Sequence, residues 1–204
     1  MTFPTPASGE PELASVRLSK QLLRQASRSR RRATSDEARA EANRSRSRLV
    51  WNFLSPTARV AMYLSRTPEP DTLGLARALV ERQRPVLVPI LAGGADAPAW
   101  GLLRSMDEVS PGPRGIPAIS GAPLAEDALS HADVILVSGL AGTLDGGRLG
   151  EGGGWFDRAL VHAGADAEVI LMLNEAEICA ELPLERHDRR VRHIATEERL
   201  ITCW

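Results

Sequence analysis

Short, continuous apolar runs alternate with helical segments along this chain. Four of the runs have the length of buried strands: residues 59–64, 85–89, 133–137 and 168–173. Helices are expected between them at 72–84 and 155–162. This alternation is typical of β-α-β units, which build a parallel sheet covered by helices. We therefore predict an α/β fold, a mostly parallel sheet flanked by helices in a Rossmann-like three-layer arrangement, with a ligand crevice at the carboxyl ends of the strands.

Two helices are predicted before the first strand. Residues 1–12 hold three prolines and few apolar residues, and we expect them to be a flexible tail. A helix is expected from about 14 to 32. A second helix opens at Thr34-Ser-Asp-Glu37, which has the spacing of a capping box, and runs to Leu54. Residues 13–204 are expected to form one domain, because 204 residues suit a single core.

The remaining segments are less regular. Glycine and proline are frequent from 92 to 126, so we expect an irregular covering region there, with a short strand at 100–103. Further short strands are expected at 191–195 and 200–202.

Charge and composition are those of an ordinary soluble globular protein. The formal net charge is −1, which gives no overall attraction to nucleic acid or membrane. The apolar runs are too short to span a bilayer, and the first residues lack a signal-peptide pattern. Cys179 and Cys203 have no metal-type spacing. We expect a cytoplasmic monomer with free thiols and with no nucleic-acid or membrane partner.

Lys20 is the only lysine in the chain, since the other 24 basic residues are arginines. Arg24 follows four positions later in the first predicted helix, so the two side chains share one face. Together they can bind a multiply charged anion. The alternative is a single surface lysine with no special role.

A glycine-rich segment, 139–158, follows the strand at 133–137. Its glycines allow backbone N–H groups to approach a phosphate, and Arg148 adds a guanidinium. Asp157, at the start of the next predicted helix, can hold a hard cation, while Trp155 and Phe156 offer planar surfaces. On local features alone, Asp157 could equally be an ordinary helix-start residue and the aromatic rings part of the core.

Four blocks in order resemble one family, 5-formyltetrahydrofolate cyclo-ligase, also called 5,10-methenyltetrahydrofolate synthetase. The resemblance covers nearly the whole chain. Its blocks are Lys20 with Arg24, Tyr63-Leu-Ser65 with Glu69-Pro-Asp71-Thr72, the segment 138–158, and Leu182-Pro-Leu-Glu-Arg-His-Asp188 with Ile194-Ala-Thr-Glu197.

The resemblance implies an ATP- and Mg²⁺-dependent closure of 5-formyltetrahydrofolate to 5,10-methenyltetrahydrofolate. It implies catalytic roles for Lys20 and Arg148, folate contacts from Leu64, Glu69 and Trp155, and magnesium ligands at Asp157 and Asp188. The ATP-binding residues that it implies are Lys20, Arg24, Arg148, Leu149, Gly150, Glu151, Gly152, Gly153, Gly154, Trp155 and Phe156.

Several positions depart from the family pattern. Glu151 replaces an arginine, so a carboxylate facing the phosphates would weaken ATP binding, and Glu151→Arg would then tighten it. Glu151 could instead turn outward, pair with Arg158 or help to hold magnesium. The remaining departures are Gly142-Thr143 for Phe-Asp, Trp155 and Phe156 for two tyrosines, Ala118 for an acid and Glu177 for a glutamine.

Two alternatives follow. A diverged relative could bind nucleotide or folate without this reaction. A nucleic-acid-binding module could use the ten arginines between Arg17 and Arg48, although acidic residues interrupt that run and favour a solvated helical face.

Overall fold

The computed structural model describes residues 10–91, 98–185 and 188–204. Its α-helices are α1 (Glu10–Ala33), α2 (Asp36–Phe53), α3 (Leu73–Val80) and α4 (Trp155–Ala159). Its 3-10 turns are η1 (Met106–Glu108), η2 (Pro113–Gly115), η3 (Ala128–His131), η4 (Leu160–His162) and η5 (Glu175–Glu177). Its strands are β1 (Val60–Met62), β2 (Val86–Ile90), β3 (Ala99–Leu103), β4 (Val109–Pro111), β5 (Pro117–Ile119), β6 (Val134–Ser138), β7 (Ala141–Gly142), β8 (Arg148–Leu149), β9 (Glu168–Met172), β10 (His193–Ala195) and β11 (Leu200–Thr202).

The main sheet has seven strands in the order β11-β10-β9-β6-β1-β2-β3. The five inner strands are parallel, and each edge adds one antiparallel strand. The chain runs from β1 to β2 on one side and later returns to β6, β9 and β10 on the other. The order therefore reverses between β1 and β6, and ligands of such folds bind at the carboxyl ends of the strands on either side of that point. The predicted α/β fold is confirmed.

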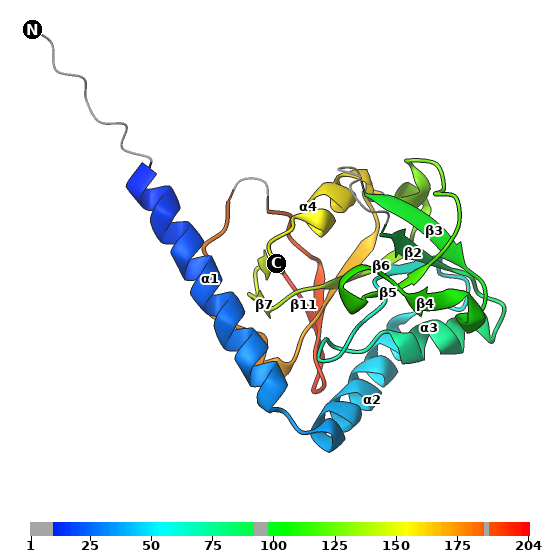
Figure 1. Cartoon of the computed structure of the whole chain (residues 1–204), viewed down its shortest axis with the longest axis horizontal. Helices are drawn as coiled ribbons and strands as arrows, with labels where there is room; N and C mark the ends of the chain where they lie inside the picture. Colours follow the sequence, from blue (N-terminus) through cyan, green and yellow to red (C-terminus); the bar gives the residue numbers. More distant parts are fainter. Residues whose placement is uncertain (1–9, 92–97, 186–187) are drawn as a thin grey trace, which may run out of the picture.

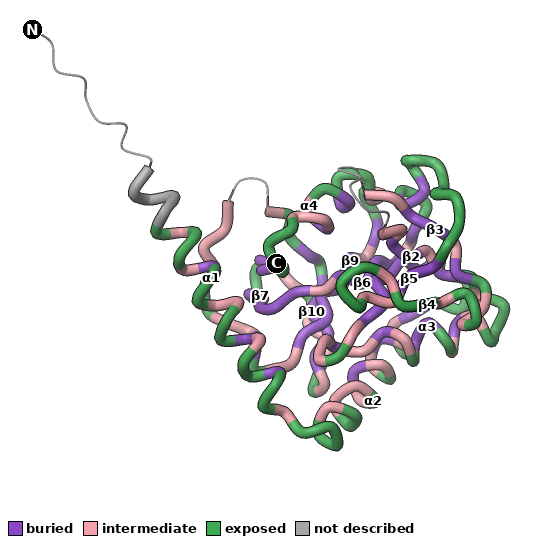
Figure 2. The backbone as a smooth tube through the Cα atoms, viewed as in Figure 1, coloured by how far each residue is buried: buried purple, intermediate pink, exposed green. Residues whose placement is uncertain are grey.

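The helices lie on both sides of the sheet. In Figure 1, α2 and α3 lie below the strands and α4 lies above them. The inner strands are mostly buried, as the purple centre of Figure 2 shows, and β1 and β10 are buried along their whole length. Met62, Leu136 and Leu171 are fully buried. Burial on two faces explains why these strands are continuous apolar runs rather than alternating ones.

The first helix starts earlier than the sequence predicted. α1 begins at Glu10 rather than near 14, so residues 10–12 of the expected tail are helical. Residues 1–9 lie outside the described part of the chain. In Figure 1, α1 runs along the left edge of the molecule, with its C-terminal half close to β7.

Two helix boundaries also differ from the predictions. Ser35, not Thr34, caps α2, because its hydroxyl accepts a hydrogen bond from the Ala38 N–H (3.2 Å). The Thr34 hydroxyl donates instead to the Arg30 carbonyl at the end of α1 (3.1 Å). α3 stops at Val80 rather than at Arg84, since Gln83 takes a left-handed conformation (φ 57°) that a helix does not accept.

Segments expected to be irregular contain strands. The short strand expected at 100–103 is present as β3, one of the two antiparallel edge strands of the main sheet, and the segment 92–126 also contributes the unpredicted hairpin β4–β5. Residues 92–97 of that segment lie outside the described part. The glycine-rich segment contains a short ladder, in which Ala141 pairs with Leu149 and Gly142 with Arg148. A three-residue or two-residue strand carries too little pattern to be recognised in a sequence.

Arginines of the first two helices hold the fold together. Arg46 of α2 is fully buried and donates to the Leu173 carbonyl and to Asn174 Oδ1, each at 2.8 Å, while it pairs with Glu197. This contact ties α2 to the end of β9.

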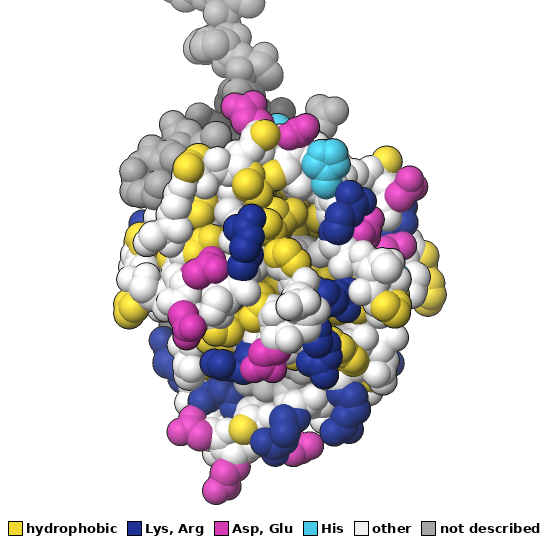
Figure 3. All heavy atoms as spheres, turned by 90° about the vertical axis from the view of Figure 1, so that its right-hand side faces the viewer, with side chains coloured by type: hydrophobic (Ala, Val, Ile, Leu, Met, Phe, Trp, Pro, Cys, Tyr) yellow, Lys and Arg dark blue, Asp and Glu magenta, His cyan; other side chains and the backbone are white. Residues whose placement is uncertain are grey.

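The surface beside β3, β4 and α3 carries both signs of charge among apolar groups (Figure 3). A uniformly cationic face, such as phosphate backbones attract, is not seen there. Among the described residues, no helix is long and apolar enough to cross a bilayer.

Candidate active site

A cavity of about 510 Å³ lies at the carboxyl ends of β1, β2 and β6. All fifteen residues predicted for the ATP, folate and metal sites line it. Lys20 and Gly152, more than a hundred positions apart in sequence, therefore share one cavity. Its location is the reversal point of the strand order, as the fold class leads one to expect.

Lys20 is buried in the wall formed by α1 and the segment before β10. Its ammonium donates hydrogen bonds to Glu185 Oε2 and Asp188 Oδ2, both at 2.7 Å. Burial alone would lower the pKa of Lys20, but the hydrogen bonds and charges of Asp188 and Glu185 outweigh it and raise this pKa above its usual value. Lys20 therefore keeps its positive charge at neutral pH.

The glycine-rich segment is held against α1. Arg24 Nε donates to the Gly150 carbonyl (2.9 Å). Gly152 (φ 106°) and Gly154 (φ 63°) take left-handed conformations that other residues rarely adopt. A Cβ atom on Gly152 would lie 3.4 Å from Arg24 Cζ. The left-handed turns at Gly152 and Gly154 thus favour glycine at the two positions where this segment bends beside α1.

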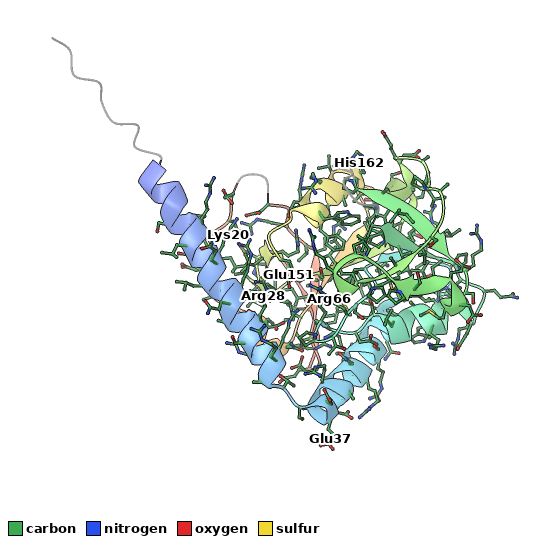
Figure 4. All side chains as sticks on the ribbon, in the orientation of Figure 1. Lys20, Arg28, Glu37, Arg66, Glu151 and His162 are labelled. Atoms are coloured by element: carbon green, nitrogen blue, oxygen red, sulfur yellow. The ribbon has the colours of Figure 1, made fainter. Side chains whose placement is uncertain are left out.

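Glu151 lines the cavity and pairs with Arg28 of α1. Arg28 Nε lies 3.0 Å from Glu151 Oε2, and a second nitrogen of the same guanidinium contacts that oxygen (Figure 4). Of the alternatives considered from the sequence, pairing with an arginine is the one observed, but the partner is Arg28 rather than Arg158. Sequence reasoning missed Arg28, although its position four residues after Arg24 places it on the same helical face.

Arg148 and Asp157 bind one another. Arg148 Nη2 lies 2.6 Å from Asp157 Oδ1, and Arg148 Nη1 donates to the Ser138 carbonyl (3.3 Å). The Arg148 side chain is only 2% exposed, and its Nε is buried without a partner among the described residues. A buried N–H group without a partner is costly, and it marks a place where a ligand atom would be stabilised.

The loop after β1 forms the opposite wall. The Tyr63 hydroxyl donates to the Pro70 carbonyl (2.7 Å), and Ser65 Oγ donates to Asp71 (2.9 Å). Asp71 in turn accepts hydrogen bonds from the first N–H groups of α3. The Thr72 hydroxyl also donates to the Tyr63 carbonyl (2.6 Å). This network explains the Tyr-x-Ser and Asp-Thr parts of the motif as groups that hold the loop in place.

Glu69 and Leu64 face the cavity from that loop. Glu69 accepts a hydrogen bond from the Arg66 N–H (3.0 Å), and the Arg66 guanidinium is 3.7 Å away. Burial raises the pKa of Glu69 above its usual value despite these contacts, and the charge of Glu151 adds to the rise. A half-buried carboxylate beside an apolar side chain suits recognition of a heterocycle that carries N–H groups.

Aromatic rings close one side of the cavity. The Trp155 ring packs edge-on against Phe156 at 5.0 Å and against Trp100 at 5.2 Å, measured between centroids. Trp100 comes from β3, is buried and supports the Trp155 ring, but it is not among the described residues that line the cavity.

The other departures from the family pattern have structural explanations. Glu177 is fully buried and pairs with Arg31 at 2.6 Å, and the same guanidinium donates to the Gly139 carbonyl. Gly142 packs under β9, where a Cβ atom would lie 2.8 Å from Leu171. Neither Gly142 nor Ala118 is among the described residues that line the cavity.

The comparisons agree with this geometry. A model of the 5-formyltetrahydrofolate cyclo-ligase family matches residues 16–197. A 5-formyltetrahydrofolate cyclo-ligase from Mycolicibacterium smegmatis is 35% identical over 155 residues, which cover 71% of this chain and 76% of that protein. One from Mus musculus is 24% identical over 159 residues, or 74% and 78% of the two chains.

Solved structures share the fold. The 5,10-methenyltetrahydrofolate synthetase of Aquifex aeolicus has a TM-score of 0.73 at 23% identity and covers 90% of this chain and 92% of its own. That of Mycoplasma pneumoniae has a TM-score of 0.68 at 16% identity, with 87% and 98% covered.

Proposed function

The chain belongs to the 5-formyltetrahydrofolate cyclo-ligase family, and we propose that it uses ATP and Mg²⁺ to convert 5-formyltetrahydrofolate to 5,10-methenyltetrahydrofolate. The observation that carries the proposal is the convergence of Lys20 and Arg24 with the backbone of 150–154 on one cavity that Leu64 and Glu69 also line. Cations, a glycine-rich backbone and an apolar wall with one carboxylate are what a nucleotide and a pterin together require.

The ATP phosphates would lie between α1 and the glycine-rich segment. Lys20 and Arg24 supply positive charge from α1, Arg148 supplies it from β8, and residues 149–156 supply the backbone and ring surface. Glu151 forms an ion pair with Arg28. The positive charge of Arg28 therefore offsets the repulsion that the Glu151 carboxylate would exert on the ATP phosphates. Phosphoryl transfer needs such alignment and charge neutralisation more than it needs a covalent nucleophile.

The folate would lie against the loop after β1. Leu64 packs on the ring system, Glu69 accepts hydrogen bonds from the pterin, and Trp155 covers it from the side of α4. This placement puts the formyl group of the folate between the loop after β1, which holds the pterin, and the glycine-rich segment, which holds the ATP phosphates. The cavity thus brings the two substrates together and lowers the entropy cost of their reaction.

Asp157 and Asp188 would hold Mg²⁺. The described residues contain no group of three or more metal-binding side chains. Two carboxylates fit Mg²⁺ nevertheless, because this ion usually takes one or two protein carboxylates and completes its shell with water and substrate phosphates. The ion supplies neutralisation of phosphate charge.

The proposed chemistry activates a stable amide. The formyl oxygen attacks the γ-phosphorus of ATP, and ADP leaves. N10 of the folate then attacks the formyl carbon and loses its proton, the bond from that carbon to the phosphorylated oxygen breaks, and inorganic phosphate departs. Lys20 and Arg148 would stabilise the charge of the transferred group, and the aromatic rings would exclude water.

One assay tests this function. The purified protein is mixed with 5-formyltetrahydrofolate, ATP and Mg²⁺, and the near-ultraviolet absorbance of the methenyl product is followed, with each component omitted in turn. Absorbance that grows only in the complete mixture supports the proposal. Binding of ATP or folate in calorimetry with no absorbance change would instead make this a diverged binding protein.

We further propose that residues 13–204 act as one domain, in a cytoplasmic monomer. Cys179 and Cys203 are free thiols, which suits a reducing compartment. Light scattering after size exclusion tests the monomer, since a single species near 22 kDa is expected.

A further inference from the structure

A second cavity of about 550 Å³ opens between α1, the loop after β1 and the turn η2. Five of its lining residues are arginines and two are glutamates, so the formal excess is five minus two, or three positive charges. Figure 4 shows Arg28 and Arg66 reaching from different elements toward the region of Glu151. An arginine-lined hollow of this kind concentrates anions.

Three of the five arginines are already engaged. Arg28 pairs with Glu151, and Arg31, which is buried, pairs with Glu177. Arg66 lies 3.7 Å from Glu69 and donates to the Arg114 carbonyl (2.7 Å). These contacts fix the walls of the cavity.

The guanidinium groups of Arg32 and Arg114 differ from these three. Neither forms a hydrogen bond or an ion pair with any residue in the described part of the chain. Arg32 belongs to α1 and Arg114 to η2, so the two come from separate elements of the lining. Their donors remain available to a ligand, and a guanidinium presents them in a geometry that matches phosphate or carboxylate oxygens.

The second cavity adjoins the cavity of the candidate active site, which we call the main cavity. Arg66, Glu69, Arg114 and Glu151 line both. A molecule bound in the main cavity can therefore extend an anionic group into the second, and a small anion can also enter it alone.

We propose that the second cavity binds a multiply charged oxyanion, with Arg32 and Arg114 as its principal donors. Two sources share this chemistry: free phosphate, or the glutamate carboxylates of a folate whose ring occupies the main cavity. The second source rests on the proposed function, whereas the first does not.

The first arm of the test uses inorganic phosphate and isothermal titration calorimetry. Replacing both Arg32 and Arg114 by alanine should weaken phosphate binding roughly tenfold, because two charge-assisted hydrogen-bonding groups are lost. The same double replacement at Arg77 and Arg104, exposed arginines that line neither cavity, should leave it unchanged. Lys20→Ala should retain phosphate binding in the second cavity.

The second arm compares 5-formyltetrahydrofolate with 5-formyltetrahydropteroate, which lacks the glutamate, in the absence of ATP. If the folate is the source, the Arg32→Ala, Arg114→Ala protein should bind the folate about tenfold more weakly and the pteroate normally. Equal affinities of the variant and the natural chain for phosphate and for folate would overturn the proposal. Neither arm requires catalysis, so these binding measurements test the second cavity independently of the proposed function. The absorbance assay of product formation tests that function.

Discussion

Arg28 of α1 forms an ion pair with Glu151 of the glycine-rich segment, and the two side chains are 43% and 39% exposed. Arg24, one turn earlier on the same helix, donates to the neighbouring Gly150 carbonyl. The carboxylate that replaces an arginine of the family pattern is therefore part of the contact between helix and loop. Arg28 of α1 supplies a positive charge beside Glu151, in place of the loop arginine of the family pattern.

Glu151→Arg should weaken ATP binding about two- to fivefold, because the new guanidinium would face Arg28 and loosen the loop from α1, and an exposed pair contributes up to about 1 kcal/mol. Combining it with Arg28→Glu should restore affinity to within about twofold. Titration calorimetry with ATP gives both values. Tighter binding by the single variant would place the carboxylate at the phosphates, contrary to the observed pair.

Lys20→Ala should lower ATP affinity by at least about tenfold and reduce the free energy of unfolding by about 1–3 kcal/mol, because Glu185 and Asp188 lose a shared cation. Arg17→Ala, on the exposed face of the same helix, is the control and should change neither. Calorimetry and urea denaturation provide the measurements. Undiminished ATP affinity in Lys20→Ala would remove this residue from the phosphate site.

Glu69→Gln should stabilise the free protein at neutral pH. The pKa of Glu69 is raised in the folded state, so its contribution to stability is fully present below the unfolded pKa, about 4.3, and is lost as pH rises through the folded value. The variant should therefore gain in melting temperature at pH 7 to 8 relative to the natural chain, and gain least near pH 4. Thermal scans across this range test the sign, and an advantage confined to acid pH would contradict it.

Gly152→Ala should destabilise the protein by about 1–2 kcal/mol and weaken ATP binding, because alanine is strained at φ 106° and its Cβ would approach Arg24. Gly153→Ala is the matched control. A Cβ at Gly153 meets nothing within 4 Å, so stability should stay within about 0.5 kcal/mol. Equal effects at the two glycines would show that the left-handed turn is not what the loop requires.

The sequence was sufficient for the long elements and for fifteen of the residues that line the cavity, but other lining residues, such as Arg66, Arg114 and Glu185, were not predicted. Buried parallel strands are recognisable because burial on both faces makes them continuous apolar runs, as at 133–137. Asp157 and the glycines could be found because they stand in a dense motif, and Lys20 because it is the only lysine and has Arg24 on the same helical face. Their roles in binding and catalysis remain predictions.

Pairing between side chains could not be predicted in the same way. The Arg148–Asp157 and Arg28–Glu151 contacts depend on how a helix lies against a loop, which motif spacing does not encode. Helix ends were also placed wrongly, because Ser35 and Thr34 are both competent caps and the backbone geometry decides between them.

Lys20 and Asp188 are 168 positions apart and yet share one hydrogen bond. During synthesis, the lysine of the first helix can meet these carboxylates only after the segment around residue 188 has left the ribosome. A nascent chain that has not reached residue 188 thus lacks a complete nucleotide pocket, and late assembly of distant contacts is expected to make this corner of the fold slow to form.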